Sequence, residues 1–175
     1  MSSGQPATQP RDPWFVRTVV ALEEAATVAL LCGIILLVVA QVAARFVFGS
    51  PFVWTEELAR YGLIWLTFMG ASYGSSKGRQ LSVDVLGQIS GRVAFLSSVL
   101  AGVATIAACA VLLPTAVESV QRMHSYPSPA LRLPLSLTYS AVVVGFALIA
   151  FHTLWRLIRS LRLKQDPGAD QIPPI

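Results

Sequence analysis

The sequence contains little charge for its length. Only 13% of its 175 residues are Asp, Glu, Lys or Arg, whereas 54% are hydrophobic and the mean hydropathy is +0.63. A soluble domain carries charge on about one quarter of its residues. The composition therefore predicts an integral membrane protein rather than a soluble one.

Cysteine and histidine are also scarce, and their positions exclude several kinds of chemistry. Cys32 and Cys109 both fall inside apolar segments and form no CxxC pair, so they are predicted to be buried structural thiols. His124 and His152 lie about one helix length apart, too far to ligate one haem within a monomer. They are interpreted as ordinary surface or interfacial histidines. We therefore expect no enzyme activity, no catalytic residue, no cofactor and no metal site.

The apolar residues are gathered into four segments that can cross a bilayer, which requires about 20 residues per helix. These predicted spans cover about 25–46, 56–76, 93–117 and 133–156. The fold class is all-α integral membrane, with one membrane domain over residues 14–163. The tails, 1–13 and 164–175, are rich in Pro, Gly, Ser and Gln and are predicted to be disordered.

Two flanking segments have a different pattern from the spans. Residues 14–24 and 80–92 place apolar side chains on one face at helical spacing, so each is expected to form a short amphipathic helix along the cytoplasmic surface. A cleaved signal peptide at the first span is disfavoured. Its apolar run of 20 residues exceeds the 7 to 15 of a typical signal core, and Glu23 and Glu24 precede it.

The basic residues are divided unequally between the two ends of the predicted spans. Arg45, Arg122 and Arg132 fall at one end, with Arg60 nearby. The other end has nine, namely Arg11, Arg17, Lys77, Arg79, Arg92, Arg156, Arg159, Arg162 and Lys164. By the positive-inside rule, the richer side is cytoplasmic, so both termini are predicted to be cytoplasmic. The basic balance is thus attributed to topology and membrane lipid, and not to nucleic acid.

No ionisable residue is placed at mid-depth in any predicted span. Such residues usually mark the path of an ion, a proton or a substrate through a membrane protein. Paired helix breaks, the other sequence sign of a transport site, are also missing, because only Pro114 interrupts a span. The chain therefore lacks the parts to move a solute alone.

The start of the second span has the most unusual pattern. Glu56 and Glu57 suit the positive end of the helix dipole, Thr55 can cap the helix, and Arg60 can pair with either glutamate. A stripe along one side of this helix contains Glu56, Arg60, Leu63, Thr67, Gly70 and Gly74. The small residues permit close approach of another helix, in this chain or in a partner, and Thr67 can hydrogen-bond across such a contact.

The same segment carries a family resemblance. WTEELARYGLIWLTFMGASYGSSKGRQLSVDVL resembles the signature of the small membrane subunit of tripartite ATP-independent periplasmic (TRAP) transporters, the DctQ-type family. The preceding ARFVFGSPFVW and the later SPALRLPLSLTYSAVVVGFAL resemble the family's connections into helices two and four. The resemblance covers about residues 20–158. Gln80 departs from it, because many members have His there.

The resemblance implies a sodium-driven, ATP-independent importer of an organic acid in the bacterial inner membrane. Its other parts would be a large polytopic subunit, which moves ions and substrate, and a periplasmic solute-binding protein that associates transiently. This chain would be the small, non-catalytic scaffold. The residues expected to organise helix two and its contact with the large subunit are Trp54, Glu56, Glu57, Arg60, Trp65, Thr67, Gly70 and Gly74.

Two other functions remain open from the sequence. A four-helix redox protein would need haem or quinone, and an unrelated membrane scaffold would associate with itself or another partner. The transported substrate cannot be read from this chain, because specificity is expected in the other two components.

Overall fold

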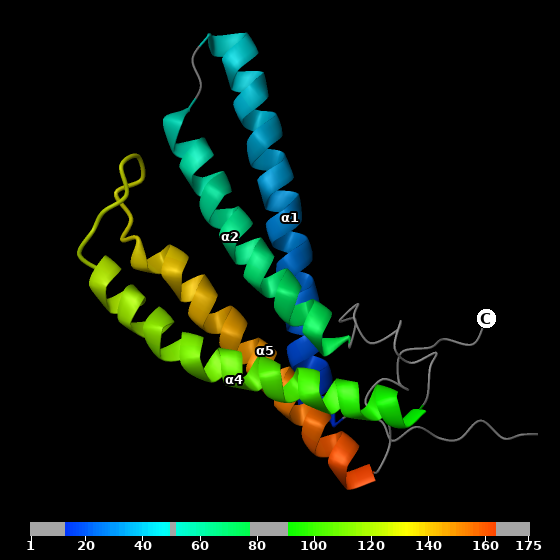
Figure 1. The fold of residues 1–175 in the computed structure, drawn as a ribbon. Helices are drawn as coiled ribbons and strands as arrows, with labels where there is room; N and C mark the ends of the chain where they lie inside the picture. The colour runs from blue at the N-terminus through cyan, green and yellow to red at the C-terminus, as the bar shows by residue number, and fades with distance from the viewer. Residues whose placement is uncertain (1–12, 50–51, 78–90, 164–175) are drawn as a thin grey trace, which may run out of the picture.

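The computed structural model describes residues 13–49, 52–77 and 91–163. Over these ranges the chain is helical apart from its connections and one isolated β-bridge, Pro127 to Pro134. The helices are α1 (Trp14–Phe48), α2 (Val53–Ser76), α4 (Gly91–Met123) and α5 (Ser136–Leu163), shown in Figure 1. The prediction of an all-α fold is confirmed.

Three of these helices are long and apolar enough to cross a membrane. The qualifying segments are Trp14–Val47 in α1, Leu96–Met123 in α4 and Ser136–Arg159 in α5. α2 has 24 residues and a less apolar composition, because Glu56, Glu57 and Arg60 fall in its first turns. Three predicted spans therefore fit the structure, while a membrane crossing by α2 stays a prediction.

The four helices form an open layer and not a closed bundle. α1 packs on α2, α2 on α5, and α5 on α4, and no other pair of described helices has closely approaching backbones. In Figure 1 the α1–α2 pair and the α4–α5 pair diverge towards one end and cross near the other. α1 and α4 are thus edge helices, and α2 and α5 form the centre of the layer.

Two glycines set the spacing between neighbouring helices. A β-carbon built at Gly62 would lie 2.9 Å from Ile34 Cγ1 of α1, and one at Gly145 would lie 2.6 Å from Phe68 Cβ of α2. Real β-carbons essentially never approach that closely, so glycine at these positions lets the helices pack at short range. Phe68 and Phe146 add an edge-to-face ring contact, with centroids 5.7 Å apart, across the same α2–α5 seam.

The structure differs from the sequence prediction at residues 14–24. These residues are the first turns of α1 and not a separate short helix. No proline interrupts Trp14–Phe48, and its one glycine, Gly33, does not end the helix, so residues 14–48 form one continuous helix of 35 residues, or about 52 Å. Residues 80–90 of the second predicted amphipathic helix lie outside the described residues, and Gly91 begins α4.

The beginning of α1 lies against the second half of α5. The rings of Phe15 in α1 and Trp155 in α5 meet edge to face with centroids 5.4 Å apart. We call this the inner end of the layer and the opposite one the outer end. The cysteine prediction was right for Cys109, which is buried, and wrong for Cys32, which is exposed on the edge helix α1. An edge helix has only one neighbour to cover it, so much of its apolar surface faces outwards.

Candidate functional site

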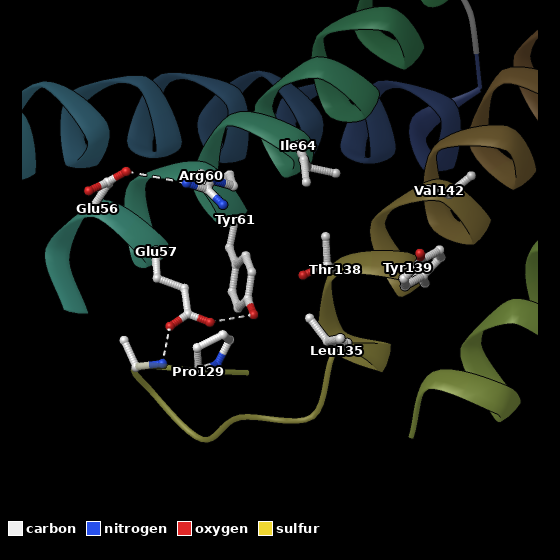
Figure 2. A pocket seen from close by; sticks show the side chains of 11 residues that line it. Glu56, Glu57, Arg60, Tyr61, Ile64, Pro129, Leu135, Thr138, Tyr139 and Val142 are labelled. Carbon is white, nitrogen blue, oxygen red and sulfur yellow. Dashed lines mark hydrogen bonds and ion pairs between the residues drawn. The ribbon is translucent and has the colours of Figure 1, made fainter. Parts of the chain in front are cut away.

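At the outer end, Glu57 of α2 holds the connection between α4 and α5. Its Oε2 accepts hydrogen bonds from the backbone N–H groups of Ala130 at 2.8 Å and Leu131 at 3.0 Å. Its Oε1 accepts a hydrogen bond of 2.8 Å from the hydroxyl of Tyr61, one turn further along α2. Both carboxylate oxygens are therefore engaged inside the chain, as Figure 2 shows for Tyr61 and the loop.

The loop that Glu57 holds has defined internal structure. Ser128 N donates to Leu133 O at 2.8 Å, and Leu135 N donates to Tyr126 O at 3.0 Å, which closes a narrow hairpin. Arg132 has a φ of 54°, in the left-handed region that a non-glycine residue seldom adopts. Two successive N–H groups that point at one carboxylate form an anion-binding arrangement, filled here by the chain's own side chain.

A pocket of about 580 Å³ lies beside the hydrogen bonds of Glu57, between α2, α5 and the loop. Figure 2 shows Arg60 and Ile64 reaching it from α2, and Thr138 and Tyr139 from α5. Leu135 reaches it from the connection just before α5. The full lining is Glu56, Glu57, Arg60, Tyr61, Ile64, Pro129, Ala130, Leu135, Thr138, Tyr139 and Val142. This volume falls in the range of sites that hold a small molecule or inserted side chains.

The predicted stripe of α2 lies on a side that no other described helix covers. Glu56, Arg60, Leu63 and Thr67 are exposed. At Gly70 and Gly74 an added β-carbon would meet no atom within 4 Å. The close contact predicted at these glycines is therefore not made within the described chain. We call this stripe, Glu56 to Gly74, the open face of α2.

The remaining predicted residues of α2 have local or intramolecular partners. Arg60 pairs with Glu56, at 3.3 Å, and not with Glu57. Trp65 Nε1 donates to Leu137 O of α5 at 3.2 Å, so it joins the two central helices. Thr67 donates to Leu63 O of its own helix, and Trp54 is half exposed beside Phe52.

The suggestion that Thr55 caps α2 was wrong. The helix begins at Val53, with Phe52 in the capping position, so Thr55 lies inside the first turn. Its hydroxyl donates to Phe52 O at 2.6 Å and accepts no backbone N–H.

A second polar cluster lies at the inner end, where three helices meet. Glu23 of α1, Ser72 of α2 and His152 of α5 are all at least 96% buried. Glu23 Oε1 lies 2.9 Å from His152 Nε2 and accepts a hydrogen bond of 3.0 Å from Ser72 Oγ. We call these three residues the inner cluster. It joins α1 to α5 through side chains, although their backbones do not approach closely.

The inner cluster continues along α5 through a second set of polar groups. Ser75 Oγ lies 3.4 Å from Thr153 Oγ1 and 3.5 Å from Arg156 Nη2. Buried polar groups require such partners, because an unpaired one loses its hydration without replacement. Polar side-chain contacts therefore join α2 and α5 at the inner end.

The inner cluster was missed by sequence reasoning, and the interpretation of His152 as an ordinary surface or interfacial histidine was wrong. It is 3% exposed and paired with a carboxylate. The available signal was the occurrence of Glu23, Ser72 and His152 near the same predicted membrane boundary. Glu23 and His152 are 129 residues apart, so the sequence alone gave no reason to pair them.

These sites join helices and present surfaces. Within the part of the chain that the structure describes, no group of three or more His, Cys, Asp or Glu residues could hold a metal ion. Glu57 and Glu23 each hold neighbouring elements through hydrogen bonds, while no other described helix covers the open face of α2.

Comparison with known proteins places the chain in a family. Residues 34–163 match the family described as tripartite ATP-independent periplasmic transporters, DctQ component. This match includes all of α2 and α5 and thus both candidate surfaces.

Two curated relatives agree with the family match. The chain is 28% identical over 114 residues to the "Isethionate TRAP transporter permease protein DctMQ" of Oleidesulfovibrio alaskensis, which aligns 63% of this chain but only 18% of that longer relative. It is 28% identical over 137 residues to a "Putative TRAP transporter small permease protein" of Haemophilus influenzae, covering 77% of this chain and 84% of that protein. The family resemblance is confirmed, and the chain belongs to the DctQ family of TRAP transporter small membrane subunits.

Proposed function

We propose that this chain is the non-catalytic scaffold of a TRAP importer, which binds the large membrane subunit through the open face of α2. The observation that carries the proposal is the uncovered stripe with Gly70 and Gly74. Small residues on a membrane helix permit close packing of a second helix, and within the described chain no helix uses this stripe.

The relatives support a large membrane subunit as the partner. In the Oleidesulfovibrio protein, a region similar to this chain is part of one longer permease. Its name, DctMQ, joins the Q of the DctQ component with a second letter, M. We propose that a large membrane subunit supplies to this chain what the rest of that permease supplies to the similar region. Ion and substrate movement would then belong to that partner, and the small subunit would contribute shape and membrane area.

Polar contacts at both ends of α2 support a scaffolding role; we call those of Glu57 the outer tie and those of the inner cluster the inner tie. Glu57 fixes its outer end to the loop before α5, and the inner cluster fixes its other end to α1 and α5. A helix held at both ends presents its open face in one orientation. Such preorganisation favours binding, because less conformational entropy is lost when the partner docks.

We further propose that α2 crosses the inner membrane with the other three helices, and that both termini are cytoplasmic. α2 packs between α1 and α5, and both neighbours contain segments that can span a bilayer. The inner end also bears Arg17, Lys77, Arg156 and Arg159 on the described helices and their caps, in agreement with the positive-inside rule.

The substrate is proposed to be an organic acid, imported with sodium after delivery by a periplasmic binding protein. Support comes from the family and from the relative named for isethionate, itself an organic anion. A direct test is uptake by proteoliposomes that contain this chain, its large subunit and the binding protein, with and without a sodium gradient.

The docking proposal is tested by co-purification of the large subunit with tagged small subunit from native membranes in mild detergent. We expect the wild-type chain to retain one large polytopic protein in near-equal amount. The double variant Gly70→Leu/Gly74→Leu should lose most of it, because two leucine side chains would separate the helices. Gly33→Leu is the matched control, since Gly33 lies in α1 and also has no atom within 4 Å of an added β-carbon.

Each result has a separate meaning. If the wild-type chain is recovered without a large subunit, the scaffold proposal is wrong. If Gly33→Leu and the double variant retain equal amounts at equal expression, the partner binds, but not through the open face of α2.

A further inference from the structure

The outer pocket lies at the end of the open face of α2 and shares residues with it. Glu56 and Arg60 belong to both, as the first polar residues of the stripe and as part of the pocket lining. A partner helix that lies along Gly74, Gly70 and Thr67 would therefore reach the pocket at its outer end. The two features form one continuous surface.

The charges in the pocket are unbalanced. Two carboxylates, Glu56 and Glu57, face one guanidinium, Arg60, so the formal sum is two negative charges and one positive, or −1. Glu57 has both oxygens engaged by Tyr61 and the loop. Among the described residues, Glu56 has only the 3.3 Å contact to Arg60, and its side chain is 67% exposed. Glu56 is therefore the carboxylate with acceptor capacity left for a partner.

The start of α5 does not reverse this charge preference. A helix N-terminus attracts anions through its free N–H groups. The second, third and fourth N–H groups of α5 are already used here, because Leu137 N donates to Pro134 O, and Thr138 N and Tyr139 N donate to Leu135 O. The rest of the lining near them is largely apolar, with Ile64 and Val142 on opposite walls.

We propose that this pocket receives a basic side chain of the large membrane subunit, Lys or Arg, with its charged end at Glu56. This inference rests on the proposed function and deepens it. Lys and Arg combine an apolar stem with a cationic end, so the stem can lie against Ile64 and Val142 while the charge reaches the carboxylate. A side chain anchored in a pocket at the edge of a helix contact also fixes the register of that contact.

The test compares two variants of the same ion pair, using co-purification of the large subunit. Glu56→Gln removes the proposed counter-ion and should reduce the recovered partner about threefold, the size expected for one partly exposed charge pair. Arg60→Gln removes the competing cation and should leave recovery unchanged or higher. A site for an anionic group would give the reverse order, which would overturn the proposal.

A second pair of variants tests the pocket without changing charge. Val142→Trp fills it and should reduce recovery of the large subunit, whereas Val103→Trp places the same ring on the exposed side of the edge helix α4 and should not. The yield and melting temperature of each small subunit verify that it folds.

Other results would contradict the inference. Equal recovery with both tryptophan variants would show that the pocket lies outside the interface. Loss of a bound phospholipid from Val142→Trp in native mass spectrometry, with assembly unchanged, would identify a lipid site instead. Failure of the wild-type chain to bind a large subunit would reject the proposed function itself, so the two failures are distinguishable.

Discussion

The two ends of α2 are joined to the molecule by different chemistry. At the outer end a partly exposed carboxylate, Glu57, accepts hydrogen bonds from the backbone of a loop. At the inner end the buried carboxyl group of Glu23 accepts a hydrogen bond from Ser72 and lies within hydrogen-bond distance of His152. The outer tie positions a connection, whereas the inner tie holds three helices together. Loss of the inner tie should therefore affect global stability, and loss of the outer tie should affect one loop.

The largest effect is expected from removal of one member of the inner cluster. His152→Leu leaves Glu23 buried beside an apolar side chain, and an uncompensated buried charge is destabilising by about 3–5 kcal/mol. Thermal unfolding of the detergent-purified subunit measures this loss. The double variant Glu23→Leu/His152→Leu removes both polar groups and should recover most of the stability. If the double variant is as unstable as the single one, packing and not charge explains the role of His152.

A smaller loss of stability is expected at the α2–α5 seam. Gly145→Ala adds a β-carbon 2.6 Å from Phe68 Cβ and forces the two central helices apart, with a cost of about 1–3 kcal/mol for overpacking. Gly33→Ala makes the same chemical change where no atom lies within 4 Å and should leave the melting temperature nearly unchanged. Equal losses from the two substitutions would show that the close approach to Phe68 is not the cause, since alanine is a better helix former than glycine.

A local effect is expected at the outer tie. Glu57→Gln removes the charge that strengthens the hydrogen bonds from Ala130 and Leu131, so the amide hydrogens of this loop should exchange faster. Amides in the middle of α5 should keep their protection. Glu118→Gln is the control, because Glu118 pairs only with Arg122 of its own helix among the interactions of the described residues. Faster exchange throughout α2 and α5 would show that the hydrogen bonds of Glu57 also contribute to global stability.

The smallest effect is expected from the exposed pair at the end of α4. Arg122 Nη2 lies 3.1 Å from Glu118 Oε2, and both side chains are more than 60% exposed. Arg122→Gln should change stability by less than about 0.5 kcal/mol, because water screens such a pair. Thermal unfolding at low and high salt checks this. A loss as large as that of His152→Leu would show that this exposed ion pair stabilises the fold as much as the buried polar contact does.

Local patterns in the sequence predicted the helices and the composition of α2. Long apolar segments indicated three of the spans, and residue spacing placed Glu56, Arg60, Leu63, Thr67 and the two glycines on one side of α2. Such predictions depend on residues within one or two helical turns of each other, and these residues can be identified from their spacing in the sequence. The division of residues 14–48 into a surface helix and a span was wrong. No proline or other local signal ends the helix between the two parts, so the chain continues as one helix.

Contacts between distant residues could not be predicted in this way. The sequence offered Glu56 and Glu57 as equivalent partners for Arg60, and only the position of the loop assigned Glu57 to Ala130 and Leu131. Gly145 and Gly62 resemble any other glycine in an apolar helix until Phe68 and Ile34 are placed against them. Which glycines are covered and which are open depends on helix order, and many orders satisfy the same apolar patterns.

That this protein is helical, belongs in a membrane and is a TRAP small subunit follows from its amino-acid sequence, because hydropathy, periodicity and family motifs are local properties. The three-dimensional packing was needed to show that the described helices form an open layer, that Glu23 and His152 meet across it, and that no other described helix covers the stripe of α2. These features depend on packing between residues up to 129 positions apart, and packing is chosen by the fit of whole helices rather than by any one segment.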